Sequence, residues 1–525
     1  MRIRGDILRT YQSVHTWTGI IAGLVLFIGF YAGSLTMFED EISQWATPSN
    51  HQLAQVPTEQ LDTLISKVLS TSEKAKESFT INLEAHLSPM TWYENKTGRG
   101  LSLNSLMMHA TLSEQGELIT HAQPTNELGD LIDMLHRTAG IAGKLGRSNL
   151  GVLVLGAASV LYFLALISGI IFLLPTLAKT FFAIRRNKGA SRFWLDSHNL
   201  IGVVSLPFHL LIAWSVIVFS FHDIFYDGLD LIYPNKPEVE QVKSAPVQNS
   251  VDKLPPIVSY IEKVDEVTDG YSIKSIAFSR MSTERASAGI SVVNYNEMMR
   301  NNTGDYIYMN PYTLKINGGS IAMNDDDYYV DYVASFFSLH FGGFGGELGR
   351  WLYFVMGLLG AFLFYSGNLL WLEKRRQKQT VQSKSNRFMA NLTVGICLGS
   401  LLAVVVTFLA SKWLYLGNVQ INNAYLNCYY LVFFAALVYS FILGAAKSAI
   451  HIQKALFIGC IGIPLTTLIT ITMPNLALWD ISNTTNLAID SLALIFAGLF
   501  YYGAIKTKKR AYYGERNSIW ALQKS

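Results

Sequence analysis

Long apolar stretches alternate with polar segments along the whole chain. A transmembrane helix needs about 20 consecutive, mostly apolar residues, and eight stretches meet this requirement. They cover residues 14–37, 149–174, 198–221, 350–372, 389–410, 426–446, 455–473 and 486–505. The pattern therefore predicts an all-α polytopic membrane protein with about eight transmembrane helices.

Two polar segments are too long to be simple connections. Residues 38–135 and 223–335 each contain a helical stretch, at 58–72 and 255–267, followed by alternating apolar and polar positions. Such alternation is typical of half-buried strands. Each segment is therefore expected to fold as a small α+β module, and both modules are expected on the same side of the membrane.

The shorter connections are basic. Lysine and arginine cluster at the N-terminus and at residues 179–192, 374–387, 447–454 and 506–510. Cytoplasmic loops carry an excess of these residues, and the basic segments are alternate connections. Both termini are therefore expected in the cytoplasm, with the first helix kept as an uncleaved anchor.

These features divide the chain into seven parts. We expect a first helix (1–37), a first extracytoplasmic module (38–135), a second and third helix with a basic loop (136–222), a second module (223–335), a fourth helix (336–376), a four-helix extension (388–505) and a cytoplasmic tail (506–525). The helices of the extension follow one another closely and lack the repeated motifs found in the first four.

The composition agrees with a membrane protein. Charged residues make up 15% of the chain, well below the roughly 25% of soluble domains. The net charge of +3 gives no indication of a nucleic-acid partner. Cys397, Cys428 and Cys460 all lie in apolar stretches, so we interpret them as buried structural thiols rather than disulfide or metal ligands.

Two short elements occur twice. Leu135–Arg147 (LHRTAGIAGKLGR) and Leu339–Arg350 (LHFGGFGGELGR) both precede long apolar stretches, and two other apolar stretches begin with H-x-x-x-G. Internal repeats commonly build membrane proteins with a site between the halves. We therefore predict a four-helix core made from a two-helix unit used twice, with one histidine at the head of each helix. In chain order these are His15, His136, His198 and His340.

The expected topology pairs these histidines by depth. His15 and His198 would lie near the cytoplasmic face, and His136 and His340 near the outer face. Imidazole is a good axial ligand of haem iron, so two histidines at one depth predict a bis-imidazole haem b, and the chain would hold two. The alternative is that these are polar helix-end residues bonded to the backbone or to lipid headgroups.

Neighbouring residues allow the same two interpretations. Nine glycines near the histidines would leave room for a flat porphyrin, although glycine also permits close helix packing without a cofactor. They are Gly19, Gly23, Gly140, Gly143, Gly202, Gly342, Gly343, Gly345 and Gly346. Arg147, Arg192 and Arg350 could pair with haem propionates, or could anchor the helices at lipid phosphates.

Other histidines and one acid are further candidates. His209 lies roughly 16 Å along the helix from His198, just after Pro207, and His222 lies near the outer helix end. Both could join or replace the repeated histidines at a haem, or could be ordinary buried and interfacial residues. Asp490 is an intramembrane acid and thus a candidate functional group. The histidines of the first module show no shared ligand spacing, so no metal site is expected there; they are His51, His86, His109 and His121.

The repeated motifs resemble the PepSY-associated transmembrane family of bacterial inner-membrane proteins. The resemblance covers about residues 6–376 and rests on the His15-x-x-x-Gly helix ending in Phe38–Glu41, the two LH…G-x-L-G-R elements and His198-x-x-x-Gly. It implies four core helices, two periplasmic PepSY-like modules, and the four repeated histidines as haem ligands. Members are often called iron-regulated membrane proteins, and some resemble haem-containing reductases of ferric siderophores. The chain departs from the family at Asn199, where arginine is frequent.

We therefore expect an inner-membrane di-haem b protein that passes electrons to a periplasmic ferric siderophore or another ferric chelate, as an oxidoreductase. Fe(II) is held less well than Fe(III) by hard oxygen ligands, so reduction would release iron. A quinol or a cytoplasmic reductase would be the donor, because no nucleotide-binding motif is present. The alternative is a membrane-anchored PepSY binding or regulatory protein acting on a peptidase or envelope partner. A transporter is disfavoured by the few charges within the extension.

Overall fold

The computed structural model describes residues 4–48, 53–95, 101–177, 185, 190–232, 253–321, 328–378, 381–417, 419–473 and 484–522. It divides into two compact units. The helical unit comprises residues 1–48, 126–227 and 354–525, and the sheet unit comprises residues 49–125 and 228–353. His51 lies outside the described residues.

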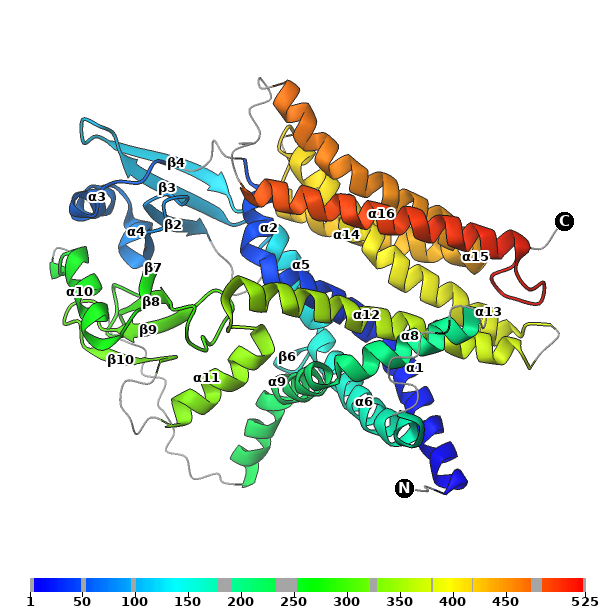
Figure 1. Cartoon of the computed structure of the whole chain (residues 1–525). Coiled ribbons are helices and arrows are strands. Elements are labelled where there is room, and N and C mark those ends of the chain that lie inside the picture. Colours follow the sequence, from blue (N-terminus) through cyan, green and yellow to red (C-terminus); the bar gives the residue numbers. More distant parts are fainter. Residues whose placement is uncertain are drawn as a thin grey trace. The chain divides into compact units, whose positions relative to one another are not determined.

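The helical unit contains most of the long apolar helices (Figure 1). Its elements are α1 (Gly5–Leu35), η1 (Thr36–Phe38), α2 (Glu39–Ala46), α5 (Leu128–Thr138), α6 (Leu150–Leu173), η3 (Leu174–Thr176), α8 (Ala190–Val204), α9 (Leu206–Ile232), α12 (Gly346–Arg376), α13 (Lys384–Thr393), η6 (Val394–Leu398), α14 (Gly399–Leu414), α15 (Ile421–Thr472) and α16 (Thr484–Tyr513), with α9 and α12 extending into the sheet unit. Among the described residues, seven helices are long and apolar enough to cross a membrane. The chain is therefore a multi-pass membrane protein.

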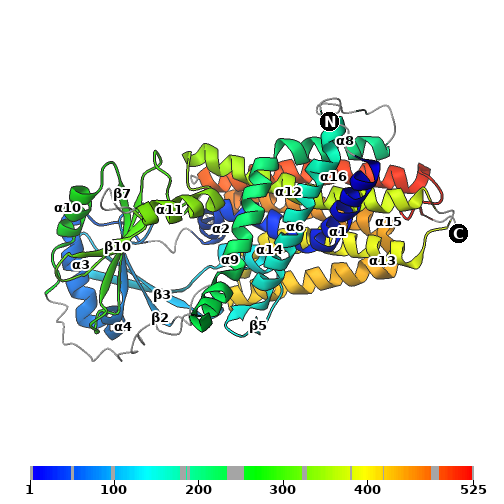
Figure 2. The ribbon, with the colours of Figure 1, turned by 90° about the horizontal axis from the view of Figure 1, so that it is seen from below.

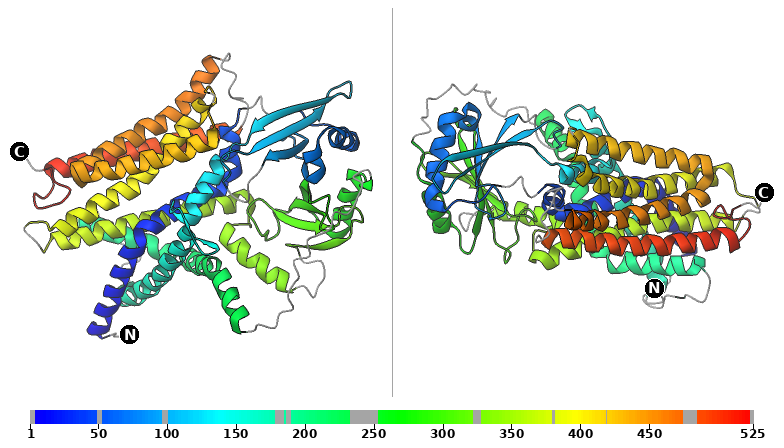
Figure 3. Two further views of the ribbon diagram at one scale, coloured as in Figure 1. Left: turned by 180° about the vertical axis from the view of Figure 1, so that it is seen from behind. Right: turned by 90° about the horizontal axis from the view of Figure 1, so that it is seen from above.

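Two of the eight expected stretches, 426–446 and 455–473, lie in the single 52-residue element α15. Its backbone is not helical at Gly444, where φ is 75°. The Tyr439 hydroxyl lies 2.6 Å from Nδ1 of His451, although twelve residues of straight helix would separate them by about 18 Å. The chain therefore reverses direction at Gly444. Figure 3 shows the yellow-to-red helices of this region lying side by side.

The prediction of one helix over residues 198–221 is wrong at its N-terminal end. The structure has two helices, α8 and α9, separated by Ser205, and the candidate span covers Leu206–Leu229. Pro207 explains the break, because proline lacks an N–H and its ring clashes with the carbonyl four residues earlier. α8 and α9 consequently run in different directions (Figure 2). His198 thus lies on the helix before the span rather than at its head.

The sheet unit is one eight-stranded antiparallel sheet instead of two separate modules. Its strands are β1 (Phe79–Asn82), β2 (Met90–Asn95), β3 (Leu106–Leu112), β4 (Leu118–Pro124), β7 (Ser272–Ser279), β8 (Ser287–Val293), β9 (Asp305–Met309) and β10 (Ile316–Gly319). The order β10-β9-β8-β7-β1-β2-β3-β4 joins the two polar segments through β1 and β7. The expectation of a helix and strands in each segment holds, but the separation into two modules is wrong.

One hydrophobic core serves both halves of this sheet. The helices α3 (Thr58–Thr71) and α10 (Ile257–Val267) contribute apolar residues to it together with the strands. Phe79 and Phe278 stack at the β1–β7 junction with ring centres 4.5 Å apart, and such pairs add about 0.5–1.5 kcal/mol beyond their burial. The N–H of Ile257 also donates to Asp62 Oδ1 at 2.9 Å. The remaining helix of this unit is α11 (Tyr328–Phe341).

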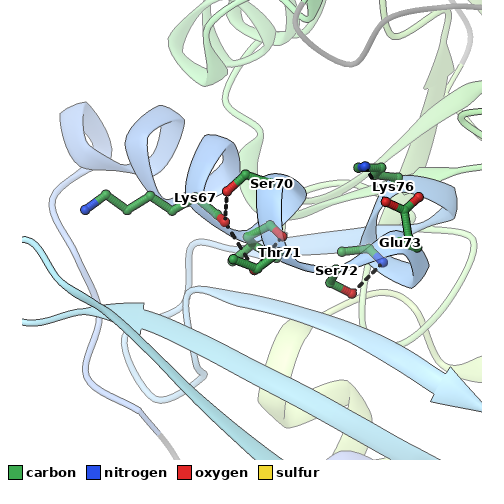
Figure 4. Close-up of polar contacts among 8 residues, drawn as sticks. Lys67, Ser70, Thr71, Ser72, Glu73 and Lys76 are labelled. Atoms are coloured by element: carbon green, nitrogen blue, oxygen red, sulfur yellow. Dashed lines mark hydrogen bonds and ion pairs between the residues drawn. The ribbon is translucent and has the colours of Figure 1, made fainter.

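A serine separates α3 from the short helix α4 (Glu73–Glu77). Ser72 ends α3 in an extended conformation, and its Oγ accepts from the N–H of Ala75 at 3.2 Å (Figure 4). This is an N-cap, which satisfies a donor that the helix itself leaves unpaired. The exposed pair Lys76–Glu73 adds little, because surface ion pairs contribute at most about 1 kcal/mol.

Candidate functional site

His15 on α1 and His198 on α8 lie together in the helical unit. Their ring centres are 6.3 Å apart and the ring planes meet at 78°. Nδ1 of His15 lies 2.8 Å from the carbonyl oxygen of Ala165. A carbonyl only accepts, so this nitrogen carries the proton and the lone pair of His15 is at Nε2.

His198 is held in the same way by a hydroxyl. Its Nδ1 lies 3.0 Å from Ser366 Oγ, and that hydroxyl donates its own proton to the carbonyl of Leu363 at 3.1 Å. Ser366 therefore accepts from the Nδ1–H of His198, which leaves the lone pair of this ring at Nε2. A ligating histidine usually donates its other N–H in this manner, because the bond fixes the tautomer and the ring orientation.

Two sets of glycines lie on the helices that carry or contact these rings, and they differ in how closely other atoms approach them. A Cβ on Gly169 of α6 would lie 2.9 Å from His15 Nδ1, and one on Gly367 of α12 would lie 3.5 Å from His198 Cε1. These glycines let the neighbouring helices approach the rings closely. The motif glycines differ: a Cβ on Gly19 would meet no atom within 4 Å, and one on Gly202 would meet only Leu363, at 3.8 Å.

The separation of the two rings agrees with shared binding of one iron. An axial Nε2 lies about 2 Å from the metal and the ring centre about 1 Å further, so two axial imidazoles on one haem have ring centres about 6 Å apart. The observed distance is 6.3 Å. His15 and His198 could therefore hold a haem, with the open space beside Gly19 and Gly202 next to it.

His136 does not stand at the head of a spanning helix. It lies in the last turn of the short helix α5, and the two-stranded hairpin of β5 (Lys144–Leu145) and β6 (Ser148–Asn149) separates it from α6. Its Nδ1 donates to the carbonyl of Gly29 at 2.8 Å. A Cβ on Gly33 would lie 2.6 Å from the same nitrogen, so only glycine permits this contact.

His340 lies in the sheet unit and, like His136, in the last turn of a short helix that precedes a spanning helix. It lies in the last turn of α11, is 9% exposed, and is followed by glycines with positive φ before α12 begins. Gly343 ties this turn to the sheet unit, because its carbonyl accepts from the N–H of Met299 at 2.7 Å. His136 belongs to the helical unit and His340 to the sheet unit, so their expected pairing stays a prediction.

His209 is a buried polar side chain of the helical unit. It is fully buried on α9, and neither of its ring nitrogens has a hydrogen-bond partner among the described residues. Its ring contacts Phe30 and Tyr162, whose buried hydroxyl is also unpaired within the described chain. Each unsatisfied buried group costs roughly 1–3 kcal/mol. A group bound from outside the chain would remove this cost.

The other predicted residues pair with carboxylates. Arg192 and Arg185 both contact Asp196, and the hydrogen bond from Arg185 lowers the pKa of that carboxyl below its ordinary value. Arg350 lies 2.7 Å from Glu347. Arg147 is 91% exposed and 3.9 Å from Asp227, and His222 is exposed beside Asp223. A role for these arginines at haem propionates stays a prediction.

One buried charge was missed by the sequence analysis. Lys412 on α14 is 1% exposed, and its Nζ lies 4.3 Å from the ring centre of Trp45 on α2. It also interacts electrostatically with the expected candidate Asp490, which is 8% exposed. The signal was a single lysine close to the end of an apolar stretch, which is normally interfacial. Its burial depends on Trp45, which is remote in sequence.

Comparison with known proteins identifies the first two thirds of the chain. The family model of the PepSY-associated TM region matches residues 12–374, which includes all four repeated histidines. No curated protein matches the chain. Among the described residues, no group of three or more His, Cys, Asp or Glu side chains is placed to hold a metal ion. The two-histidine arrangement at His15 and His198 is therefore the main candidate site.

Proposed function

Because the chain belongs to the PepSY-associated TM family, we propose that it is a bacterial inner-membrane haem b protein that reduces a periplasmic ferric siderophore or another ferric chelate. The proposal rests chiefly on one observation, the 6.3 Å separation of the His15 and His198 rings. Two polar rings in an apolar helical region are costly unless they bind something. Their protonated Nδ1 atoms and available Nε2 atoms support an iron ligand role.

Bound haem would supply a reversible one-electron Fe(III)/Fe(II) couple. The protein's own part is to hold the two ligand rings and to set their donor strength. Ala165 and Ser366 accept the Nδ1 protons of His15 and His198, which makes each imidazole a stronger electron donor. The glycines Gly169 and Gly367 keep the rings at these positions.

A complete path across the membrane needs a second group near the outer face. We propose that His136 and His340 supply it, and that the buried His209 contributes to one of the two haems. We propose eight spans, with the two segments of α15 counted separately. An even number puts both termini on one side, and the basic connections support the cytoplasm as that side and the periplasm for the sheet unit. Electrons would come from a quinol or a cytoplasmic reductase, and the sheet unit would hold the ferric chelate.

The test is an absorption spectrum of the purified protein, oxidised and then reduced with dithionite, with haem counted per chain. We expect a reduced b-type spectrum and about two haems per chain, as two histidine levels imply. His15→Ala and His198→Ala should each remove about half of the haem. His451→Ala is the matched control, because His451 is exposed and bonded to Tyr439.

Two results would contradict this function. A colourless protein, after expression with ample haem, would favour the membrane-anchored binding or regulatory protein that acts on a peptidase or envelope partner. Full haem content in both His15→Ala and His198→Ala would remove the observation on which the proposal rests.

A further inference from the structure

The four-helix extension holds the first turn of α5. Glu127, the residue before this helix, donates its N–H to Oδ1 of Asn422 on α15 at 2.9 Å. The neighbouring Asn126 donates from Nδ2 to the hydroxyls of Tyr415, at the end of α14, and Tyr425, on α15, at 2.8 and 3.1 Å. Glu127 and Asn422 are 5% and 2% exposed, so water cannot readily replace the bond between them.

The turn after α5 is held by the same extension. Its backbone is left-handed at Ala139 and Gly140, where φ is 50° and 73°. The carbonyl of Gly140 accepts from the hydroxyl of Tyr430 on α15 at 2.8 Å. A Cβ on Gly140 would also lie 3.9 Å from the ring of Tyr429, so the turn packs directly against α15. Both ends of α5 are thus attached to α15.

His136 lies between these two attachments. It is nine residues after Glu127 and four before Gly140, and its Nδ1 donates to the carbonyl of Gly29 on α1. The fit is tight, because a Cβ on Gly33 would lie 2.6 Å from the same nitrogen. α5 has only 11 residues, and helices of this length are marginal without tertiary contacts. The position of His136 on α1 therefore depends on what holds the ends of α5.

The extension is an addition to the part of the chain that the family model matches. That match ends at residue 374, before α13 begins, whereas Asn422 and Tyr430 both lie on α15. The matched part contains α1 and α5 but not these two residues. The attachments therefore connect the extension to the helix of the core that carries His136.

We infer that the extension is a positioning element for the haem proposed near the outer face. Asn422 and Tyr430 hold the two ends of α5 and so keep His136 against α1; both act through this helix and are positioning residues. The inference rests on the proposed function, because it takes His136 to be a ligand of that haem. A less firmly held imidazole stabilises Fe(III) less, so loosening α5 should raise the midpoint potential of the outer haem.

The first test does not need the haem. Hydrogen–deuterium exchange of the full-length protein in detergent is compared between the parent and the variants Tyr430→Phe and Asn422→Ala. Loss of one hydrogen bond should speed local opening about 2- to 10-fold. Tyr430→Phe should therefore speed exchange at residues 139–147, and Asn422→Ala should speed it at residues 127–131.

Matched control variants lose bonds that lie within α15. Tyr439→Phe removes a hydroxyl 2.6 Å from His451 Nδ1, and Asn423→Ala removes the acceptor of the Asn427 amide at 3.4 Å. Neither should change exchange in α5 or in the turn that follows it. Unchanged exchange in both test variants would overturn the inference, whatever haem the protein contains.

The second test measures whether the attachment changes the haem. In a redox titration followed by absorption, Tyr430→Phe should raise the midpoint potential of the haem that is lost in His136→Ala, and should leave that of the haem lost in His15→Ala. A role in stability alone would lower the unfolding temperature without shifting one haem selectively. No shift, or equal shifts of both haems, would therefore contradict a positioning role. A colourless protein would contradict the proposed function and the haem role with it, while the exchange test would still decide whether the extension holds α5.

Discussion

The helical unit and the sheet unit each bring together segments that are far apart in the sequence, but the side chains at the two junctions differ in chemistry. In the sheet unit, β1 and β7 pair so that Phe79 stacks on Phe278. In the helical unit, α1 and α8 bring His15 next to His198. The apolar junction is closed and fully packed, whereas the polar junction has ring centres 6.3 Å apart and open space beside Gly19.

This difference indicates what each junction is for. Phe79 and Phe278 lie at 2% exposure within one shared core, so their contact mainly stabilises the fold. The two histidines sit in an apolar helical region, where polar rings lower stability unless they are bound. The first junction therefore holds the strands of the two polar segments together, and the second is the site that we propose for a bound haem. Three substitutions test this comparison.

The largest effect is expected at the apolar junction. Phe278→Ala should lower the free energy of unfolding of the sheet unit by about 3–5 kcal/mol, because it opens a cavity at the centre of the core. Limited proteolysis of the full-length protein across a urea series measures this change. Tyr308→Ala is the matched control, since Tyr308 is 46% exposed on β9 of the same sheet. Equal losses in both variants would mean that the junction is not the main stabilising contact.

A smaller effect is expected at the polar junction. Ser366→Ala removes the acceptor of the His198 Nδ1–H, which weakens the imidazole as a donor to Fe(III). A hydrogen bond of about 0.5–1.5 kcal/mol corresponds to a rise of about 20–60 mV in the midpoint potential of one haem. A spectroelectrochemical titration measures it. Ser168→Ala is the control, because Ser168 is equally buried but bonds only within α6; a shift of the same size there would contradict this role.

The smallest effect concerns a buried acid of the sheet unit. Burial raises the pKa of Asp305 above its ordinary value, although Ser320 Oγ and the N–H of Arg300 donate to it. A folded-state pKa above the unfolded one gives stability that is present below pH 3.8 and is lost as pH rises through the raised value. Asp305→Asn keeps the accepting oxygen and should make the unfolding temperature less dependent on pH in the acidic range. An unchanged pH profile would contradict this account.

Much of the architecture follows from local patterns. The apolar stretches predicted the spanning helices, because a membrane requires about 20 apolar residues whatever their partners. Alternation predicted strands in both polar segments, and the repeated motifs predicted that His15 and His198 lie at one depth. Helix boundaries were less predictable. Pro207 lies inside an apolar stretch, and the sequence does not say whether it ends the helix or only bends it. The outcome depends on whether neighbouring groups form hydrogen bonds with the backbone groups that proline leaves unpaired.

Long-range pairing was beyond the sequence pattern. Pro57 and Phe79 in the first segment and Pro256 and Phe278 in the second are separated by the same 199 residues, yet nothing local states that β1 must pair with β7. Either segment could have formed its own small sheet with the same alternation. Strand partners are selected by the packing of side chains across strands, which depends on the whole face.

The sequence by itself determined the membrane class and the residue types available for a site, because these depend on hydropathy and on which residues are present. Only the tertiary structure decided which of these residues meet. The tertiary structure places His15 next to His198 and His136 in contact with Gly33. It also pairs His109 with His121 across two strands and buries Lys412 beside Trp45. The physical reason is that hydropathy acts residue by residue, whereas contacts depend on the close packing of segments far apart along the chain.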